Sequence, residues 1–475
     1  MAHTLKAYYY TDPATAVTVD FMGAVTGTTG IAVDSYQMGI PGIEQARNNS
    51  LYSDSPRPVY SKHGMVTDVL TVTVRGSTNT VLYTNLHLLA KLGEYARLGA
   101  QNGTNCPSAY LQLKPGGSAV GEVLYAVIYD CRVELPADWA MSQDATLMIE
   151  DVTVTIERGL WRSQTPGISY IDNNISGTNQ PFASSASSSL SIGGDASALI
   201  RLTVNHGTLG TKGQMDRVIV GYRSLALGGS SYNALGKKEA ESATLGTDTS
   251  AVADATASGG NVARCTQTTA PSTPAVRVSG AVVPRGTHRV FARMKITGTA
   301  VSSVYLRYSD ESVANGGVFT PNTAVLVSST SWLVYDMGIV RALDVPGTVV
   351  YGTYQVYSSL SSGAGNLDID WVYLMPTEGY ITAQGLGITT SAPDSTRVFE
   401  YQNGIETNTT CICYLASPKA TAKPAYTASI SPPPGACALY WLIGTDSGSV
   451  FDVGIFDSAE IVLYTVPRYL MPSVV

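Results

Sequence analysis

Short stretches in which apolar and polar residues alternate recur along this chain, and they constrain its fold more than any other feature. Residues 68–75 (DVLTVTVR) and 288–296 (HRVFARMKI) are the clearest examples. Successive side chains of a strand point to opposite faces, so each stretch predicts a strand with two different faces. Gly, Ser, Asn and Pro separate such stretches at short intervals. A mainly β chain with many short strands follows.

One helix is expected within this β-rich sequence. Thr84 suits the N-cap, and Gly99 suits the end of the helix. Between them, an apolar stripe recurs at helical spacing, made by Leu88, Leu89, Leu92, Tyr95 and Ala96.

The 475 residues are more than one core usually serves, and about 100–200 residues per domain predicts two to four domains. Residues 1–163 are expected to form a β-sandwich with one helix. Residues 164–189 are small, polar and proline-containing, which predicts a linker or a strap over a neighbour. A jelly-roll β-sandwich over 190–380 and a C-terminal β-rich domain over 381–475 complete the expected order.

The content of charged and aromatic residues limits the kinds of molecule that the chain is expected to bind. Charged residues make up 14% of the chain, against about 25% in ordinary soluble proteins. The 28 Tyr outnumber the 7 Phe, which suits either partner-facing surfaces or exposed strands, and both readings stay open. Net charge is −7 without a basic block, so nucleic acid is not an expected partner.

No catalytic motif is recognised. The five histidines are scattered, and free thiols are expected for the six cysteines, with Cys106–Cys131 and Cys413–Cys437 bridges left open. Asp368 and Asp370 share one strand face. Such a pair suits a glycosidase, a cation site or a solvated face. We predict that the chain is not an enzyme, with a glycan hydrolase as the weaker alternative.

The N-terminal third resembles the distal tail proteins of long-tailed phages. The resemblance lies in residues 68–99 (DVLTVTVRGSTNTVLYTNLHLLAKLGEYARLG) and 151–162 (DVTVTIERGLWR). In that family, a sandwich with a helix and a hairpin forms a hexameric ring at the end of the tail tube. The resemblance implies a homo-oligomer that contacts tail tube and tail hub or fibre proteins. Tail tube proteins share a related fold, so a tube subunit with a large decoration is the alternative.

Residues 239–380 resemble the galactose-binding-like jelly rolls of carbohydrate-binding modules. The resemblance lies in EAESATLGTDTS (239–250), GGNVARC (259–265), GTHRVFARMKITG (286–298) and LDIDWVYLMP (367–376). In such modules, an opening Glu-x-Glu and an acid of the last strand often bind structural calcium. The matching positions are Glu239, Glu241 and Asp370, and carboxylates suit calcium.

Sugars stack on aromatic rings, with polar groups around the rim. From the aromatic residues of the jelly roll we select Tyr305, Arg307 and Tyr354 as the candidate carbohydrate-binding face, and we expect Trp371 to lie in the core. No signal peptide and no run of 18 apolar residues is found, so we expect synthesis in the host cytoplasm and no membrane span. Together these features predict a structural virion protein of a phage tail tip that adheres to a host-surface glycan.

Overall fold

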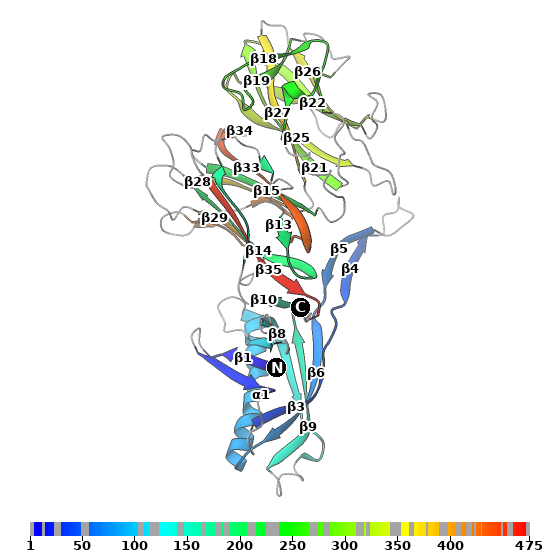
Figure 1. Cartoon of the computed structure of the whole chain (residues 1–475), viewed down its shortest axis with the longest axis vertical. Helices are drawn as coiled ribbons and strands as arrows, with labels where there is room; N and C mark the ends of the chain where they lie inside the picture. The colour runs from blue at the N-terminus through cyan, green and yellow to red at the C-terminus, as the bar shows by residue number, and fades with distance from the viewer. Residues whose placement is uncertain are drawn as a thin grey trace.

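The computed structural model is mainly β, with several antiparallel sheets and one α-helix among the described residues. These residues build three modules in a row, with the N-terminal one at the bottom of Figure 1. The structure describes residues 4–11, 15–22, 30–48, 57–102, 109–114, 123–139, 147–163, 167–175, 182–183, 190–206, 215–224, 237–266, 274–278, 286–309, 318–319, 324–342, 353–360, 365–376, 379–388, 398–403, 410–414, 420–421, 424–428, 430–447, 450–453 and 459–471.

The N-terminal sandwich is built around one long strand, β8 (Leu124–Glu134). Its first half pairs with β7, and its second half pairs with β9. One set of strands runs β2 (Ala16–Asp20), β1 (Thr4–Tyr10), β7 (Ala109–Lys114), and the other runs β3 (Gly30–Gln37), β6 (Val66–Arg75), β9 (Met148–Arg158). The alternation predicted for residues 68–75 is confirmed by β6, whose Leu70, Val72 and Val74 are buried.

The helix α1 (Asn79–Asn102) is longer than predicted. The Val81 amide donates to Thr78 Oγ1 at 3.3 Å, so Thr78 caps the helix. The predicted cap, Thr84, instead donates to the Thr80 carbonyl inside the first turns, at 2.7 Å. Gly99 does not end the helix, because a glycine costs a helix only about 1 kcal/mol.

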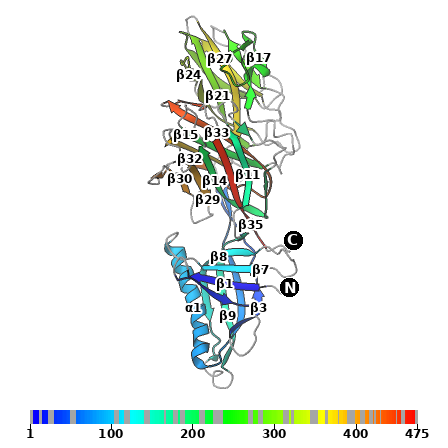
Figure 2. The ribbon, with the colours of Figure 1, turned by 60° about the vertical axis from the view of Figure 1, so that its left-hand side comes forward.

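The predicted apolar stripe of α1 is confirmed. Leu89, Leu92 and Ala96 are fully buried, and Leu88 packs beside them on the same core. Tyr95 stacks on Tyr9 of β1 with ring centroids 5.0 Å apart. The helix therefore closes one side of the N-terminal sandwich, as Figure 2 shows.

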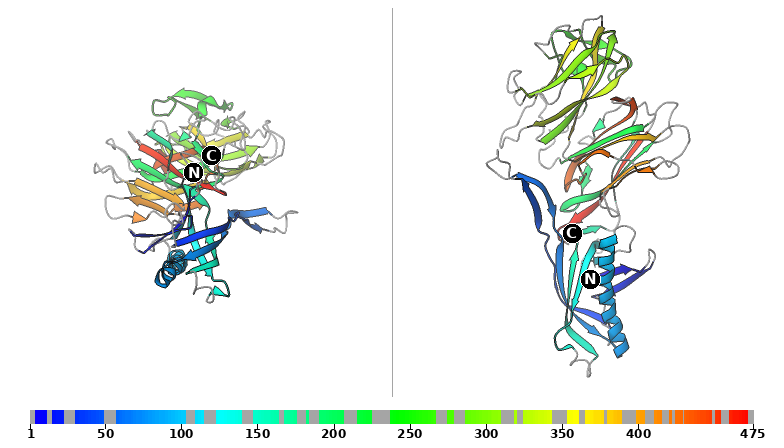
Figure 3. Two further views of the ribbon diagram at one scale, coloured as in Figure 1. Left: turned by 60° about the horizontal axis from the view of Figure 1, so that its bottom comes forward. Right: turned by 180° about the vertical axis from the view of Figure 1, so that it is seen from behind.

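A hairpin projects from this sandwich. It consists of β4 (Ile43–Asn48) and β5 (Arg57–His63), which pair with each other and with no other described strand. Figures 1 and 3 show it reaching from the N-terminal sandwich toward the level of the middle module. Ile43 is 64% exposed, and Ile40 and Met65 beside the hairpin are 71% and 60% exposed.

The middle module is a second sandwich assembled from distant parts of the chain. One sheet contains β11 (Gly167–Ile175), β35 (Ala459–Tyr469), β14 (Ala196–His206), β29 (Val398–Asn403), β30 (Thr410–Tyr414) and β31 (Ala420–Thr421). The facing strands are β12 (Phe182–Ala183), β13 (Leu190–Ile192), β15 (Met215–Ser224), β28 (Gly379–Ile388), β32 (Pro424–Ala428), β33 (Gly435–Ser447) and β34 (Val450–Val453). A shared apolar core lies between them.

This organisation differs from the predicted domains 190–380 and 381–475. Residues 190–224 pair with the strands after residue 379, so the jelly roll is inserted into the middle sandwich. The predicted linker 164–189 supplies β11 and β12, which pair with β35 and β33. These pairings join residues about 160 to 300 positions apart, which local sequence patterns do not report.

The last strand joins the middle and N-terminal modules. β35 pairs with β14 and β11 in the middle sandwich, and its end pairs with β10 (Trp161–Ser163) through Tyr469 and Trp161. β10 in turn pairs with β8 of the N-terminal sandwich. The two modules are thus connected through one continuous sheet, which favours a fixed relative orientation.

Two further sequence expectations concern cysteines and membranes. Cys131, Cys265 and Cys437 are buried free thiols, so neither bridge left open above is formed. The side chains of the other three cysteines lie outside the described residues. In the part of the chain that the structure describes, no helix has the length and apolar character needed to span a bilayer.

A buried ion pair joins strands β6 and β9 of the N-terminal sandwich. Arg158 donates from Nε to Asp68 Oδ2 at 2.6 Å and from Nη2 to Oδ1 at 3.0 Å, and both side chains are inaccessible to solvent. Tyr36 and the Gly39 amide also donate to Asp68. The guanidinium lies 4.3 Å from the Trp161 ring centroid. Every carboxylate oxygen therefore has a partner, which offsets the cost of burial.

Replacing Asp68 by Asn should destabilise this sandwich by about 3–5 kcal/mol, because it leaves the Arg158 charge buried without a counter-charge. Urea-dependent hydrogen exchange at the β6 and β9 amides would report it. Asp130→Asn is the matched control, since its partner Arg132 is 69% exposed and such pairs are worth about 1 kcal/mol or less. Equal stability of the two variants would contradict the role given to this pair.

Candidate functional site

Residues 237–376 form a two-sheet β-sandwich, called here the jelly-roll module. Its first sheet, the β27 sheet, has the order β18 (Thr249–Ala253), β19 (Asn261–Cys265), β27 (Gly365–Pro376), β21 (Gly286–Gly298), β25 (Leu333–Ala342), with β16 (Lys237–Glu239) beside β27. Its second, the β22 sheet, has the order β17 (Thr244–Leu245), β20 (Val276–Val278), β26 (Thr353–Leu360), β22 (Ser302–Ser309), β23 (Val318–Phe319), with β24 (Val325–Val327) beside β22. A continuous apolar core separates the two sheets.

The predicted metal ligands gather at one edge of the β27 sheet. Glu239 pairs with Trp371, the neighbour of Asp370, and Glu241 follows in the short 3-10 turn Ala240–Ser242. Asp370 is the extra residue of a β-bulge, because Arg293 pairs with Trp371 and the next residue, Met294, pairs with Ile369.

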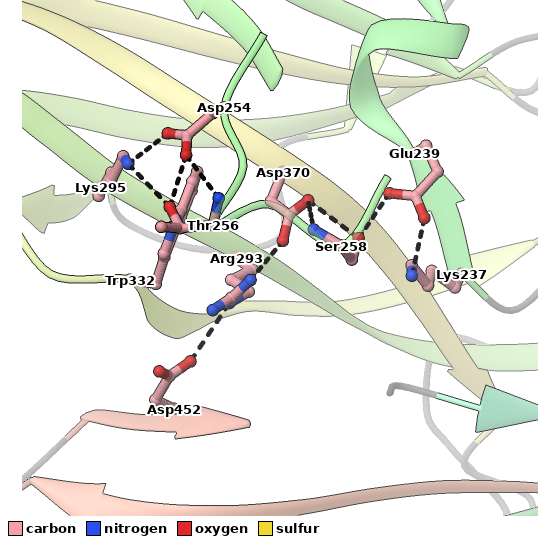
Figure 4. Close-up of polar contacts among 10 residues, drawn as sticks. All are labelled: Lys237, Glu239, Asp254, Thr256, Ser258, Arg293, Lys295, Trp332, Asp370 and Asp452. Carbon is pink, nitrogen blue, oxygen red and sulfur yellow. Dashed lines mark hydrogen bonds and ion pairs between the residues drawn. The ribbon is translucent and has the colours of Figure 1, made fainter. Parts of the chain in front are cut away.

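Ser258 connects two of these carboxylates, as Figure 4 shows. Its hydroxyl lies 2.9 Å from Glu239 Oε2 and 3.0 Å from Asp370 Oδ1, and its amide donates to the same Asp370 oxygen at 3.0 Å. Lys237 pairs with Glu239 at 2.7 Å. The next residue, Gly259, leaves room at the cluster, since a Cβ there would lie 2.9 Å from Glu241 Oε1.

Glu241 forms no ion pair with another described residue. Its Oε2 is buried and has no hydrogen-bond partner among the described residues. Burial raises the pKa of Glu241, and the negative charges of Glu239 and Asp370 raise it further, although the nearby charge of Lys237 partly lowers it. An ionised Glu241 is therefore disfavoured unless a cation lies nearby.

The donor set of this cluster fits a calcium ion. Three carboxylates and a hydroxyl offer only oxygen, which calcium prefers. In the described part of the chain, however, no group of three His, Cys, Asp or Glu side chains is arranged so that it could hold a metal ion. Two of the carboxylates instead meet Lys237 and Arg293. The cluster thus fits calcium in its donor chemistry, and the Glu241 oxygen without a hydrogen-bond partner is the feature that favours a cation there.

Arg293 connects the carboxylate cluster to the middle module. Its Nη1 donates to Asp370 Oδ2 at 2.6 Å, and its Nε donates to Asp452 Oδ1 of β34 at 3.2 Å. The guanidinium also lies 5.0 Å from the ring centroid of Trp332. Figure 4 shows Arg293 between the two acids, one from each module.

Trp332 is surrounded by polar partners rather than open to a ligand. It is 8% exposed, and Lys295 Nζ lies 4.3 Å from its ring centroid. The indole NH donates to Thr256 Oγ1 at 2.8 Å, and Lys295 pairs with Asp254 at 2.5 Å. Burial opposes ionisation of Asp254, but hydrogen bonds from Lys295 and Thr256 lower its pKa to about 2. The polar side chains around Trp332 are thus bonded to one another, and the ring offers no free face to a ligand.

An apolar seam covers another part of the outer face of the β27 sheet. Side chains of β21, β25 and β27 pack against β15 and β33 of the middle sandwich, through Phe291, Val334, Trp371, Tyr373 and Met375 on one side and Ile219, Ala438, Tyr440 and Leu442 on the other. In addition, β34 pairs with β33 and with β25, so the two modules share a sheet. The middle module therefore covers the part of this face where the residues of the seam lie.

Two buried polar contacts complete the seam. Arg223 Nη1 donates to His288 Nε2 at 2.9 Å, and Tyr373 Oη donates to the Trp441 carbonyl at 3.2 Å. Burial and the neighbouring Arg223 charge lower the pKa of His288 to about 3, so it stays neutral there. His288 is thus a packed histidine at the seam.

The carboxylate pair on which a hydrolase would depend is engaged in ion pairs. Asp368 accepts from Arg264 at 2.7 and 2.8 Å, and Asp370 accepts from Arg293; neither acid is exposed. An acid and nucleophile of a glycosidase must both reach the sugar. The hydrolase alternative therefore loses its candidate residues.

The β22 sheet carries the predicted sugar-binding residues. Tyr305 and Arg307 lie on its outer face, half-buried, and the Arg307 guanidinium is 5.2 Å from the Tyr305 ring centroid. Tyr354 pairs with Tyr308, whereas Gln355 pairs with Arg307. The register therefore puts Tyr354 in the other set of alternating positions, and its side chain lies outside the described ones.

Several residues of this region could not be identified as site residues from the sequence. Ser258, Arg293, Trp332 and Asp452 join the cluster because of tertiary pairing, and no local motif marks them. Arg277 was missed as well. It pairs with Gln355, which in turn pairs with Arg307, so the two arginines lie in one row across the strands. The expectation that Trp371 is core is confirmed, since it is fully buried.

No protein-family model and no curated protein matches the chain. Among solved structures it is similar to the CBM22-1 xylan-binding domain of Paenibacillus barcinonensis Xyn10C, at 14% identity and a TM-score of 0.23, covering 30% of this chain and 97% of that domain. It is also similar to a chain of the phage p2 baseplate, at 8% identity and a TM-score of 0.24, covering 78% of this chain and 98% of that one. A third similar structure is SPP1 Dit, a phage hub protein, at 9% identity and a TM-score of 0.21, covering 79% of this chain and 99% of that one. All three TM-scores are low, so the function proposed below rests on the residues and contacts of this chain.

Proposed function

We propose that this chain is a structural virion protein of a phage tail tip, of the distal-tail or baseplate-hub kind. In this proposal, residues 1–163 close into a homo-oligomeric ring that joins the tail tube to the hub or fibre proteins. The jelly-roll module faces outward and adheres to a host-surface glycan. The sequence resemblances of residues 68–99, 151–162 and 239–380 to distal tail proteins and carbohydrate-binding jelly rolls favour this reading.

The hairpin β4–β5 is the observation that carries the proposal of self-assembly. It leaves the sandwich without pairing to any other described strand. Exposed Ile43 lies on it, with exposed Ile40 and Met65 at its base. Exposed apolar side chains on and beside a projecting hairpin are typical of a surface that another chain covers. A closed ring supplies such a neighbour to every copy.

The position of the jelly-roll module supports the adhesive part of the proposal. The module lies at the end of the molecule opposite the N-terminal sandwich (Figures 1 and 2). The seam covers part of its β27 sheet, so we assign the ligand-binding role to the outer face of the β22 sheet. Weak sugar sites repeated around a ring would act together and raise avidity.

Assembly is tested by replacing Ile43 with Asp. We expect the wild-type chain to form a closed particle of about six copies, and the variant to dissociate, because a charge would be buried in the contact between copies. Sedimentation velocity with negative-stain microscopy measures both. Leu326→Asp, at a 66% exposed residue of the jelly-roll module, is the control and should leave the particle intact. A wild-type monomer would contradict the proposal, and open tubes would favour a tail tube subunit.

We further propose that Glu239, Glu241 and Asp370 hold a structural calcium ion in the jelly-roll module. Calcium at millimolar concentration should raise the melting temperature of the chelator-treated protein, because a ligand that binds only the folded state stabilises it. Calorimetry of wild type and Glu241→Gln measures this, and the variant should lose the increase. Glu150→Gln, at an exposed residue of β9, is the control. A wild type that melts at the same temperature with and without calcium would refute the site.

A further inference from the structure

The strand β11 is an open edge of the middle sandwich. It pairs with β35 along one side, from Gly167 opposite Thr465 to Ile175 opposite Ala459. β35 is paired with β14 along its other side, and no further described strand pairs with β11. The free side of β11 therefore presents backbone amide and carbonyl groups to which another strand can add.

Two large apolar side chains lie on this edge. Ile168 is 60% exposed and Ile171 is 54% exposed. Ile168 pairs with Tyr464 and Ile171 pairs with Val462, because the register shifts at a bulge between the two isoleucines. Tyr464 and Val462 are two positions apart and so share a face of the sheet, while Leu463 between them lies in the core. Both isoleucines therefore belong to the outer face of the middle sandwich.

The sequence of β11 gives this edge little protection. Proteins usually guard an open edge with lysine, proline, a bulge or a very short strand. β11 is nine residues long and contains bulges, but it has neither lysine nor proline. A long edge with exposed isoleucines is a liability in an isolated chain, so we expect the assembled protein to cover it.

The hairpin β4–β5 has matching features. Its two strands pair with each other and with no other described strand, so each also has an open edge. The hairpin reaches toward the level of the middle module, to which β11 belongs (Figures 1 and 3). Ile43 on β4 and Ile40 beside the hairpin are exposed. Of the five exposed isoleucines among the described residues, four thus lie on or directly beside these two elements.

A second copy of the chain is the occupant that these features favour. Within one chain the hairpin and β11 do not pair with each other. In a closed ring, every copy offers one surface to the copy before it and a different surface to the copy after it. The hairpin and β11 supply two such surfaces, and ring closure would cover both in every copy.

We propose that the hairpin β4–β5 of one copy adds to the open edge of β11 in a neighbouring copy, so that the sheet of the middle sandwich continues across the contact. Ile40 and Ile43 then cover Ile168 and Ile171 and remove them from water. Main-chain hydrogen bonds give the contact its direction, and the isoleucines add apolar burial. This inference rests on the proposed ring and names the surface that receives the hairpin.

Cross-linking between two cysteine variants tests this contact. Ile43→Cys and Ile171→Cys chains, each with its own tag, would be co-expressed and treated with a short bis-maleimide. We expect a cross-linked pair that contains one chain of each kind, and no pair from either variant alone. Ile43→Cys with Ile339→Cys is the matched control and should give no pair, since Ile339 is an exposed isoleucine of the jelly-roll module. The three described native cysteines are buried, and wild type treated in parallel reports any reaction of native thiols.

Hydrogen exchange gives an independent readout. In the particle, the β11 amides should exchange at least about tenfold more slowly than in the dissociated Ile43→Asp variant, because pairing with the hairpin protects them. The edge strand β18 of the jelly-roll module is the internal control and should exchange equally in both samples. Ile168→Asp should dissociate the particle as Ile43→Asp does, since it places a charge in the same contact.

The outcomes separate this inference from the proposed function. An intact ring without the mixed cross-linked pair, or with unchanged exchange in β11, overturns the pairing while the ring itself stands. A pair formed by Ile43→Cys alone also overturns it, because that result would place two hairpins against each other. If the wild-type chain stays monomeric, the proposed ring fails, and this inference fails with it.

Discussion

The apolar seam between the jelly-roll module and the middle sandwich decides what the rest of the molecule can do. It buries Trp371 and Tyr373 from one module against Tyr440 and Leu442 from the other, and such aromatic contacts dominate the energetics of interfaces. The shared strand β34 and the bridging Arg293 add directional contacts to the seam. A module fixed in this way presents one constant face, instead of swinging on a linker.

The same seam explains why the sandwich has two unlike faces. The β27 sheet supplies apolar residues to the seam and has ion pairs beside it. The β22 sheet has Tyr305, Arg277 and Arg307, all half-buried, on its outer face. At the other end of the molecule, the hairpin β4–β5 exposes Ile43. One end thus suits assembly and the other suits contact with a ligand, and β35 connects the two through a continuous sheet.

Local sequence patterns predicted the local structure well. The alternation in residues 288–296 places Val290, Ala292, Met294 and Ile296 in the core, as expected. The stripe of α1 is buried as predicted, although the capping residue is Thr78 rather than Thr84. Glu239, Glu241 and Asp370 are close enough for their charges to interact, although calcium binding itself stays a prediction.

What the sequence did not predict depends on contacts between distant residues. The middle sandwich combines residues 167–224 with residues 379–469, so no boundary visible in the composition marks it. The contact of Arg293 with Asp452 spans 159 positions and depends on the insertion of one module into another. Tyr354 was chosen for its aromatic character, but the strand register separates its position from those of Tyr305 and Arg307. Register is set by pairing partners, which a single strand does not reveal.

A single-particle cryo-electron microscopy map of the assembled full chain tests the central claim most directly. If the seam fixes the jelly-roll module, its density should be as well defined as that of the middle sandwich, with the outer face of the β22 sheet turned to solvent and β4–β5 against a neighbouring copy. Density for the module that is smeared relative to the middle sandwich, or a β22 sheet buried between copies, would contradict the account.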